Sequence, residues 1–337
     1  MEKNSPRFLV VGPSWIGDMV LAQSLFQVIK QRHPNARLDV LAPAWTHPLL
    51  ARMPQVDQAV AAPFVHGRLD LGTRLRLGRG LRARDYDHAI VLPNSLKSAI
   101  VPFVARARRR TGFTGEFRYG LLNDRRFLDK HGLPRTVDRF VALALAPGEN
   151  LPEIPAPRLT ADAERARAAL ARLQRNPPAQ PVLGLCPGAE YGPAKRWPAE
   201  YFAAVAKSKL DEGWEVWLFG SEKDKPETAA VQSLTQGRCF DLGGQTSLEE
   251  AIDLLSLTAA VVTNDSGLMH VAAALDRPVV AVYGSSDPRH TPPLTPKARV
   301  LYLDLSCSPC FERECPLGHL NCLRQLGPER VLAALKG

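Results

Sequence analysis

A carboxylate, a hydroxyl, a glycine and an imidazole occur together in one short turn of the sequence. Asp265, Ser266, Gly267 and His270 follow an apolar run and open a stretch with helical periodicity. The first backbone N–H groups of a helix have no acceptor within the helix, so a turn of this kind can bind an anion. Asp265 and Ser266 could equally cap the helix. A histidine in this company favours contact with a ligand over a purely structural hydrogen bond.

A second candidate anion site is the glycine-bearing loop 187–198, which also follows an apolar run. It contains Gly188 and the adjacent cations Lys195 and Arg196, and Pro198 suits the first turn of the helix that we expect next. Two cations beside a helix N-terminus would bind a diphosphate. The alternative is a solvated basic loop without a ligand.

The loop 12–18 lies between the first predicted strand and the first predicted helix. It is not the GxGxxG dinucleotide fingerprint, because the glycine spacing is wrong and Pro13 and Trp15 intrude. Asp18 would sit at or beside the helix N-terminus, where a carboxylate commonly acts as a cap. The functional alternative for Asp18 is a general base.

Acidic residues also follow the predicted strand 214–220. Glu222 and Asp224 lie where an acidic side chain binds ribose hydroxyls in dinucleotide sites. The alternative is a capped, solvated loop.

Four of the six cysteines fall within 16 positions near the C-terminus, at Cys307, Cys310, Cys315 and Cys322. Gaps of two, four and six residues between them are compatible with a structural Zn²⁺ site, although a second CxxC pair is missing. The alternative is four reduced thiols in a long loop. Disulfides are disfavoured in the cytoplasm, which is where we expect this protein.

The net charge of +9 is concentrated in one half of the chain. Residues 1–155 contain 23 Lys and Arg against 13 Asp and Glu, a net of +10, whereas residues 156–337 have a net of −1. The arginines of the basic half include Arg74, Arg76, Arg79, Arg82, Arg84, Arg106, Arg108, Arg109, Arg110, Arg118, Arg125 and Arg126. Such a half attracts phosphate groups. Aromatic residues are not interleaved with these arginines for stacking, so we do not expect nucleic acid as the partner.

The elements that must position these residues form a repeated pattern of short apolar run, loop and helix. Predicted strands lie at 7–12, 38–43, 88–93, 109–113, 181–188, 214–220, 238–244, 260–265 and 278–284. Predicted helices lie at 19–34, 161–175, 198–212, 225–235, 247–257, 266–275 and 328–336. Continuous apolar strands are typical of parallel sheets covered on both faces, so the pattern predicts an α/β protein.

The proline-rich segment 146–160 divides the pattern into two series, for which we predict doubly wound domains at 1–155 and 156–337. The last helix could return to the first domain. Ligands of such domains bind outside the carboxyl ends of the strands, where the candidate loops lie, and we expect a cleft between the domains. No apolar stretch approaches the roughly 20 residues of a membrane span. The N-terminal apolar run ends at Gly12 and is too short for a signal peptide, which favours a cytoplasmic protein.

The motifs, taken together and in this order, resemble the ADP-heptose:lipopolysaccharide heptosyltransferases, and most closely the type II enzymes. The resemblance rests on GPSWIGDMVLAQSL at the start, LAPAW at 41–45, LPNSLKSA at 92–99, PGAEYGPAKRWP at 187–198 and NDSGLMHVAAAL at 264–275. It implies a GT-B fold of two Rossmann-like domains facing a central cleft. It also implies transfer of L-glycero-D-manno-heptose from ADP-heptose to the first heptose of the lipopolysaccharide inner core, with inversion. The acceptor would be phosphorylated lipid A–Kdo–heptose, and the protein would lie peripherally on the inner membrane.

The resemblance further implies roles for individual residues. Asp18 would be the general base, and Lys195 would act in catalysis by contacting the donor phosphates. Donor contacts are expected from Gly188, Lys195, Arg196, Asp224, Asp265, Ser266, Gly267, Leu268 and His270, with Glu222 as the rival of Asp224. Acceptor contacts are expected from Ser14, Trp15, Asn94, Lys97 and Arg118. Ala194 offers no side-chain ligand, and the cysteines do not belong to the shared motifs.

A single displacement needs a base on the attacking hydroxyl and charge stabilisation on the leaving diphosphate. The sequence has no DxD-type motif at a strand end, so we expect neither a catalytic metal nor a required cofactor. Alternatives are a heptosyltransferase of another inner-core step, a transferase of another nucleotide sugar, or a non-catalytic nucleotide- or membrane-binding protein.

Overall fold

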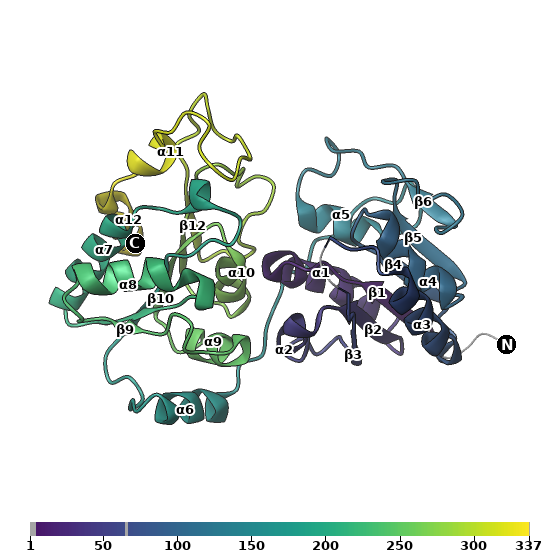
Figure 1. Cartoon of the computed structure of the whole chain (residues 1–337), viewed down its shortest axis with the longest axis horizontal. Coiled ribbons are helices and arrows are strands. Elements are labelled where there is room, and N and C mark those ends of the chain that lie inside the picture. The colour runs from purple at the N-terminus through teal and green to yellow at the C-terminus, as the bar shows by residue number, and fades with distance from the viewer. Residues whose placement is uncertain (1–4, 65–66, 337) are drawn as a thin grey trace. The chain divides into compact units, whose positions relative to one another are not determined.

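The computed structural model describes residues 5–64 and 67–336 of the chain. The chain divides into two compact units at Pro157–Arg158, two residues after the predicted boundary. The first unit runs from purple to blue and the second from teal to yellow in Figure 1. Each unit is described below by itself.

The first unit is built on a six-stranded parallel sheet with the order β3-β2-β1-β4-β5-β6. Its strands are β1 (Arg7–Val11), β2 (Arg37–Ala42), β3 (Gln58–Ala61), β4 (His88–Val91), β5 (Arg109–Phe113) and β6 (Asp124–Arg126). Its helices are α1 (Ile16–Arg32), α2 (His47–Leu50), α3 (Leu71–Leu81), α4 (Ile100–Val104) and α5 (Thr136–Ala142). Leu9 and Val91 of the central strands pack with Leu81 and Val101 of α3 and α4, which explains why these strands are apolar throughout.

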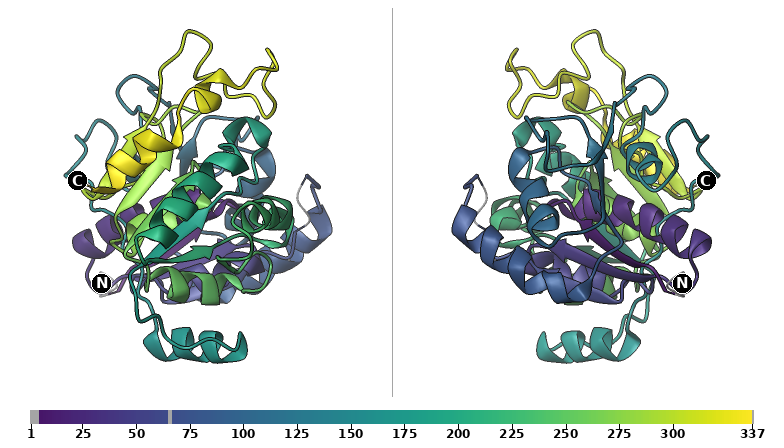
Figure 2. Two further views of the ribbon diagram at one scale, coloured as in Figure 1. Left: turned by 90° about the vertical axis from the view of Figure 1, so that its left-hand side faces the viewer. Right: turned by 90° about the vertical axis from the view of Figure 1, so that its right-hand side faces the viewer.

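The second unit repeats this design with a six-stranded parallel sheet in the order β12-β11-β10-β7-β8-β9. Its strands are β7 (Val182–Cys186), β8 (Glu215–Leu218), β9 (Phe240–Asp241), β10 (Ala260–Asn264), β11 (Val279–Val282) and β12 (Ala298–Leu301). Its helices are α6 (Ala163–Arg172), α7 (Ala199–Asp211), α8 (Lys225–Leu234), α9 (Leu248–Leu255), α10 (Gly267–Ala274), α11 (Asn321–Arg324) and α12 (Pro328–Lys336). Helix α6 contacts α9 and lies outside the layers that cover the sheet (Figure 2).

Both sheets have the strand order 3-2-1-4-5-6 when the strands of each unit are numbered from its own start. This is the order of doubly wound nucleotide-binding sheets, whose ligand crevice opens where the order reverses. The reversal lies between β1 and β4 in the first unit and between β7 and β10 in the second.

Several elements differ from the sequence prediction. Strands β3, β6 and β12, all at or near a sheet edge, carry too few buried apolar residues to have been recognised. Helix α1 begins at Ile16 rather than residue 19. Helix α12 contacts α7, β11 and β12 of its own unit.

The proline-rich linker contains no helix or strand from residue 143 to 162. Before the division, Ser24 Oγ donates to the Pro155 carbonyl at 2.6 Å, and Gln27 donates to that of Ala156 at 3.0 Å. After it, the Leu159 N–H donates to the Ala274 carbonyl at 2.9 Å. Among the described residues, no helix combines the length and apolar character required to cross a membrane.

Candidate active site

The reversal point of the second sheet brings together the two loops that carry the predicted anion-binding residues. Strand β7 is followed by the loop that ends in a 3-10 turn, Pro193–Lys195, and strand β10 is followed by Asp265 and α10. Lys195 Nζ donates to Asp265 Oδ2 at 2.5 Å, although the two residues are 70 positions apart. The loop 187–198 and the turn that begins at Asp265, which are separate motifs in the sequence, therefore form one site.

Asp265 is the centre of a small, mostly buried polar network. Its Oδ2 also accepts a hydrogen bond from Ser286 Oγ at 2.5 Å. The Asp265 side chain is 6% exposed and that of Lys195 is 17% exposed. Pairing and hydrogen bonding offset the large cost of removing these charges from water. Lys195 Nζ also lies 4.8 Å from the ring centroid of Tyr191, a cation–π distance.

Asn264, the last residue of β10, holds both ends of the loop 187–198, which carries Lys195 and is called the basic loop below. Its amide donates to the Pro187 carbonyl at 2.7 Å, and its Oδ1 accepts from the Trp197 N–H at 3.0 Å. Both ends of the loop are thereby tied to the strand that carries Asp265. This role of Asn264 was not predicted from the sequence, although a polar residue at the end of an apolar strand is a usable signal; Asn264 is fully buried.

His270 lies in the first turns of α10 and is only 5% exposed. Burial lowers its pKa from 6.5 to about 4, with Asp265 opposing the shift and Lys195 adding to it, so the imidazole is neutral at pH 7. Its Nδ1 is buried and has no hydrogen-bond partner within the described chain. Because buried polar atoms are normally paired, this nitrogen is a candidate ligand contact.

The N-terminus of α10 leaves backbone donors for an anion. Ser266 occupies the N-cap position but its side chain makes no capping bond, and Gly267 and Leu268 are the first two helical residues. The carboxylate of Asp265 accepts hydrogen bonds from Lys195 and Ser286. The prediction that the side chains of Asp265 and Ser266 cap the helix is therefore wrong. Ser266, Gly267 and Leu268 are all partly exposed. A phosphate could therefore reach their N–H groups.

Arg196 is placed differently from Lys195. Its guanidinium pairs with Glu227 and also donates to the Ala189 carbonyl at 3.3 Å. Its charge is thus already balanced by the side chain of α8. The expected direct donor contact of Arg196 stays a prediction, whereas its visible role is to hold the loop.

Asp224, rather than Glu222, lies beside the donor loop. A Cβ on Gly188 would come within 2.1 Å of Asp224 Oδ1, so the glycine is required for this close approach. Asp224 Oδ2 accepts from Ser221 N and Oγ at 2.9 and 2.7 Å, forming a capping box. Glu222 instead extends outward and pairs with Lys225. The geometry favours Asp224 of the two rivals.

In the first unit, Asp18 lies after β1, at the reversal point of the sheet. It is the third residue of α1 and is partly exposed, while Trp15 occupies the N-cap position. The capping interpretation of Asp18 is therefore wrong in detail, although a carboxylate in the first turn is still stabilised by the helix dipole. Ser14 is exposed and Trp15 is 45% exposed, so both are accessible as predicted contacts.

The loop after β4 carries Asn94 and Lys97, which are exposed and partly exposed, respectively. Arg118 is only 2% exposed. Its guanidinium donates to the Pro93 carbonyl at 2.7 Å, to Asn94 Oδ1 at 3.2 Å and to the Phe113 carbonyl. Arg118 is thus placed to position the loop of Asn94, which is a different role from the predicted direct acceptor contact.

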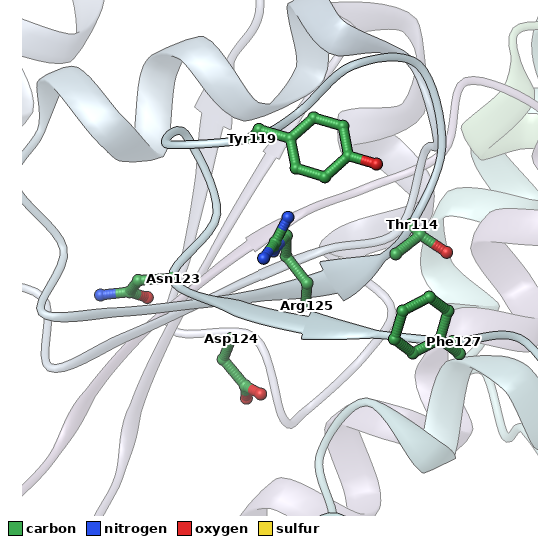
Figure 3. Close-up of a pocket in the computed structure, with 6 residues that line it drawn as sticks. All are labelled: Thr114, Tyr119, Asn123, Asp124, Arg125 and Phe127. Carbon is green, nitrogen blue, oxygen red and sulfur yellow. The ribbon is translucent and has the colours of Figure 1, made fainter.

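A surface pocket of about 460 Å³ lies beside these loops in the first unit. It is lined by Thr114, Tyr119, Asn123, Asp124, Arg125 and Phe127 (Figure 3). Phe127 is 87% exposed and Tyr119 is 68% exposed. The Arg125 guanidinium lies 4.7 Å from the Tyr119 ring centroid.

The expectation that nucleic acid is not the partner stays a prediction. Arginines of the basic half do stack on aromatic rings: besides Arg125, Arg74 lies 3.8 Å from the Phe64 ring centroid. The partners are too distant in sequence for a spacing rule to find. Since these pairs form within the chain, they do not themselves indicate nucleic acid.

The comparison with known proteins agrees with the observed fold. The sequence pattern of glycosyltransferase family 9 (heptosyltransferase) matches residues 74–321. Lipopolysaccharide heptosyltransferase 2 of Salmonella typhimurium is 48% identical over 338 residues, covering 98% of this chain and 97% of that protein. The protein of the same name from Escherichia coli K12 is 46% identical with the same coverage. The structure of E. coli ADP-heptose lipopolysaccharide heptosyltransferase II has a TM-score of 0.88 and 44% identity, covering 98% of this chain and 97% of that one.

Two parallel six-stranded sheets with helices, matched over nearly the full length by a heptosyltransferase structure, define a GT-B-type α/β glycosyltransferase. The chain belongs to glycosyltransferase family 9, the heptosyltransferases, and the resemblance seen in the sequence is confirmed. It is accordingly a transferase related to enzymes of lipopolysaccharide biosynthesis.

Proposed function

We propose that the protein transfers L-glycero-D-manno-heptose from ADP-heptose to the first heptose of the lipopolysaccharide inner core, with inversion at the anomeric carbon. The observation that carries the donor assignment is the Lys195–Asp265 pair at the start of α10, beside the unpartnered Nδ1 of His270. Identity of 46–48% to two lipopolysaccharide heptosyltransferase 2 proteins supports this step of the inner core over others.

On the donor side, the diphosphate of ADP-heptose would bind Lys195 and the free N–H groups of Gly267 and Leu268. Asp265 holds the ammonium of Lys195 in place, so the cation is oriented before the donor arrives. Asp224, packed over Gly188, would accept hydrogen bonds from the ribose hydroxyls. The buried Nδ1 of His270, in the neutral imidazole ring, would form a hydrogen bond with the donor.

In the reaction, the acceptor hydroxyl attacks the anomeric carbon while its proton passes to the carboxylate of Asp18. The new C–O bond forms as the bond to the diphosphate breaks, and ADP leaves with the electron pair. Lys195 and the N-terminus of α10 stabilise the charge that develops on the leaving group. Direct displacement from the opposite side produces inversion.

On the acceptor side, the first unit supplies Ser14, Trp15, Asn94 and Lys97 as accessible groups, while Arg118 positions the loop of Asn94. We propose that the exposed ring of Phe127 and the Arg125–Tyr119 stack contact the lipid surface that carries the acceptor. Aromatic rings and arginines together suit the boundary between headgroups and acyl chains of an anionic membrane. In this proposal the protein is a peripheral enzyme on the cytoplasmic side of the inner membrane.

The test is a transfer assay with defined substrates. With heptosyl-Kdo₂-lipid A as acceptor, ADP-heptose should be consumed and one heptose added, and the product linkage should have the inverted anomeric configuration. An acceptor that lacks the first heptose should be inactive. Equal or better use of a UDP-sugar would contradict the donor assignment, and preference for another acceptor would move the enzyme to a different inner-core step.

A further inference from the structure

Four cysteines near the C-terminus have no role in the proposed donor or acceptor site. They are Cys307, Cys310, Cys315 and Cys322, which we call the cysteine cluster. All four are free thiols. They line one small cavity of about 20 Å³, which Ala194, Ser285 and His319 also border. A cavity of this volume accommodates about one atom the size of a water molecule. Four sulfurs around a space of one atom are an unusual arrangement for unconnected thiols.

The cluster has two features of a thiolate metal site. The residues between Cys315 and Cys322 form a compact turn, in which the Gly318 N–H donates to the Cys315 carbonyl at 3.0 Å and the Leu323 N–H donates to the Leu320 carbonyl at 2.9 Å. The four cysteines, spread over 16 residues of sequence, all border the same cavity, and thiolates are preferred zinc ligands. Four thiolates around one cavity would repel one another, so their deprotonated forms require a cation between them.

We propose that the cysteine cluster binds one Zn²⁺ ion and that this ion braces the loops around Lys195. Zn²⁺ prefers four tetrahedral thiolate or imidazole ligands, and a set of four cysteines satisfies that preference. Within the described residues, no group of three or more His, Cys, Asp and Glu side chains already stands as a metal-ligand set. Binding therefore includes an inward turn of the thiols, with loss of their protons to solvent.

The segment between Cys307 and Cys315 is tied to the basic loop of the donor site. The Ala194 N–H donates to the Arg313 carbonyl at 3.0 Å, and the Tyr191 hydroxyl donates to the Phe311 carbonyl. A Cβ on Gly192 would lie 2.5 Å from the same Arg313 oxygen, so this backbone contact requires a glycine.

The same segment is tied to the loop that carries Ser286. The Phe311 N–H donates to the Ser285 carbonyl at 2.7 Å, and Ser308 Oγ donates to the Gly284 carbonyl at 2.5 Å. Ser286 and Lys195 are the two residues that hold Asp265. An ion in the cysteine cluster would therefore hold in place both the loop that carries Lys195 and the loop that carries Ser286.

The test measures metal directly in the full-length chain. Wild type is purified under reducing conditions, supplied with Zn²⁺, freed of excess ion and examined by native mass spectrometry and elemental analysis. We expect about one Zn²⁺ per chain. Cys310→Ser and Cys315→Ser should each weaken zinc retention against a competing chelator by about tenfold or more. Cys239→Ser is the matched control, because Cys239 is a buried thiol that contacts Thr235 and lies outside the cluster.

A second readout keeps the proposal testable if the serine variants do not fold. Wild type loaded with Co²⁺ should show thiolate-to-metal charge-transfer absorption, which is lost on adding Zn²⁺ in excess. Removal of the metal should lower the melting temperature and weaken ADP binding, and Zn²⁺ should restore both.

Wild type that retains no Zn²⁺ under reducing conditions, or a Cys315→Ser variant that retains as much as wild type, overturns the metal site. Unchanged ADP binding after metal removal overturns the bracing role. That second part rests on the proposed donor site, whereas zinc stoichiometry does not, so the two failures are distinguishable.

Discussion

The two units share one strand order but present different surfaces at their reversal points. In the second unit, Lys195, Asp265 and His270 are largely buried and already positioned by Asn264 and Ser286. In the first unit, Ser14, Trp15 and Asn94 are exposed, and the neighbouring pocket carries bare aromatic rings. Under the proposed function, the buried, pre-formed site of the second unit would bind the small nucleotide sugar, and the open, amphiphilic surface of the first unit would bind the large glycolipid.

The largest effect is expected from removal of the proposed base, Asp18, in the first unit. Asp18→Asn should lower kcat by about 10²–10⁴, because the attacking hydroxyl loses its proton acceptor. ADP affinity, measured by calorimetry, should stay near the wild-type value, since the donor groups lie in the other unit. A kcat within about tenfold of wild type, or roughly 1.4 kcal/mol of barrier, would show that Asp18 is not the base.

On the pre-formed side, Lys195→Met should lower kcat/KM by about 10²–10³ through loss of charge stabilisation on the leaving diphosphate. It should also lower the free energy of unfolding by about 1–3 kcal/mol, because the carboxylate of Asp265 loses a buried partner. The double variant Lys195→Met/Asp265→Asn separates the two effects: denaturant unfolding should recover while activity stays low. Recovery of both would mean that Lys195 acts only in folding.

His270 allows the donor site to be tested through the KM for the donor and through the pH dependence of protein stability. His270→Gln should raise KM for the donor by about tenfold, as one buried hydrogen bond is lost. The folded pKa of about 4 lies below the unfolded value of 6.5, so the unfolded state binds more protons between these values. Wild-type stability should therefore fall as the pH drops from 6.5 towards 4.

The pH control is the difference between wild type and His270→Gln. His88 also has its pKa lowered to about 4, mainly by burial, and contributes to both proteins. The variant should thus lose less stability than wild type over the same pH range, measured by chemical unfolding. Identical pH dependence in the two proteins would argue against a buried neutral His270.

The smallest effect is expected at the pocket of the open side. Phe127→Ser should weaken binding to vesicles of anionic phospholipid about fivefold to tenfold, in line with the loss of one inserted aromatic ring. Transfer to a soluble, deacylated acceptor should be unchanged. Leu234→Ser, at an exposed apolar residue of α8 outside the pocket and the cysteine cluster, is the control. Equal vesicle binding by Phe127→Ser and wild type would remove the pocket from the membrane contact.

Much of the fold follows from local signals. Buried strands such as β1, β7 and β10 are continuous apolar runs, and the glycine- and proline-rich loops after them mark the candidate sites. Strands β6 and β12 escape such reasoning, because edge strands gain stability from pairing with a neighbour more than from burial of their side chains.

The fold class, the loops that follow the strands and the motifs shared with the heptosyltransferases can all be recognised in the amino-acid sequence. Which side chains pair with one another, by contrast, depends on the three-dimensional fold. Lys195 pairs with Asp265, which is 70 residues away along the chain. Arg196 pairs with Glu227, and the guanidinium of Arg118 donates to Asn94 Oδ1. The physical reason is that these partners meet through neighbouring strands and loops that are distant along the chain, whereas periodicity and turn chemistry act over a few residues.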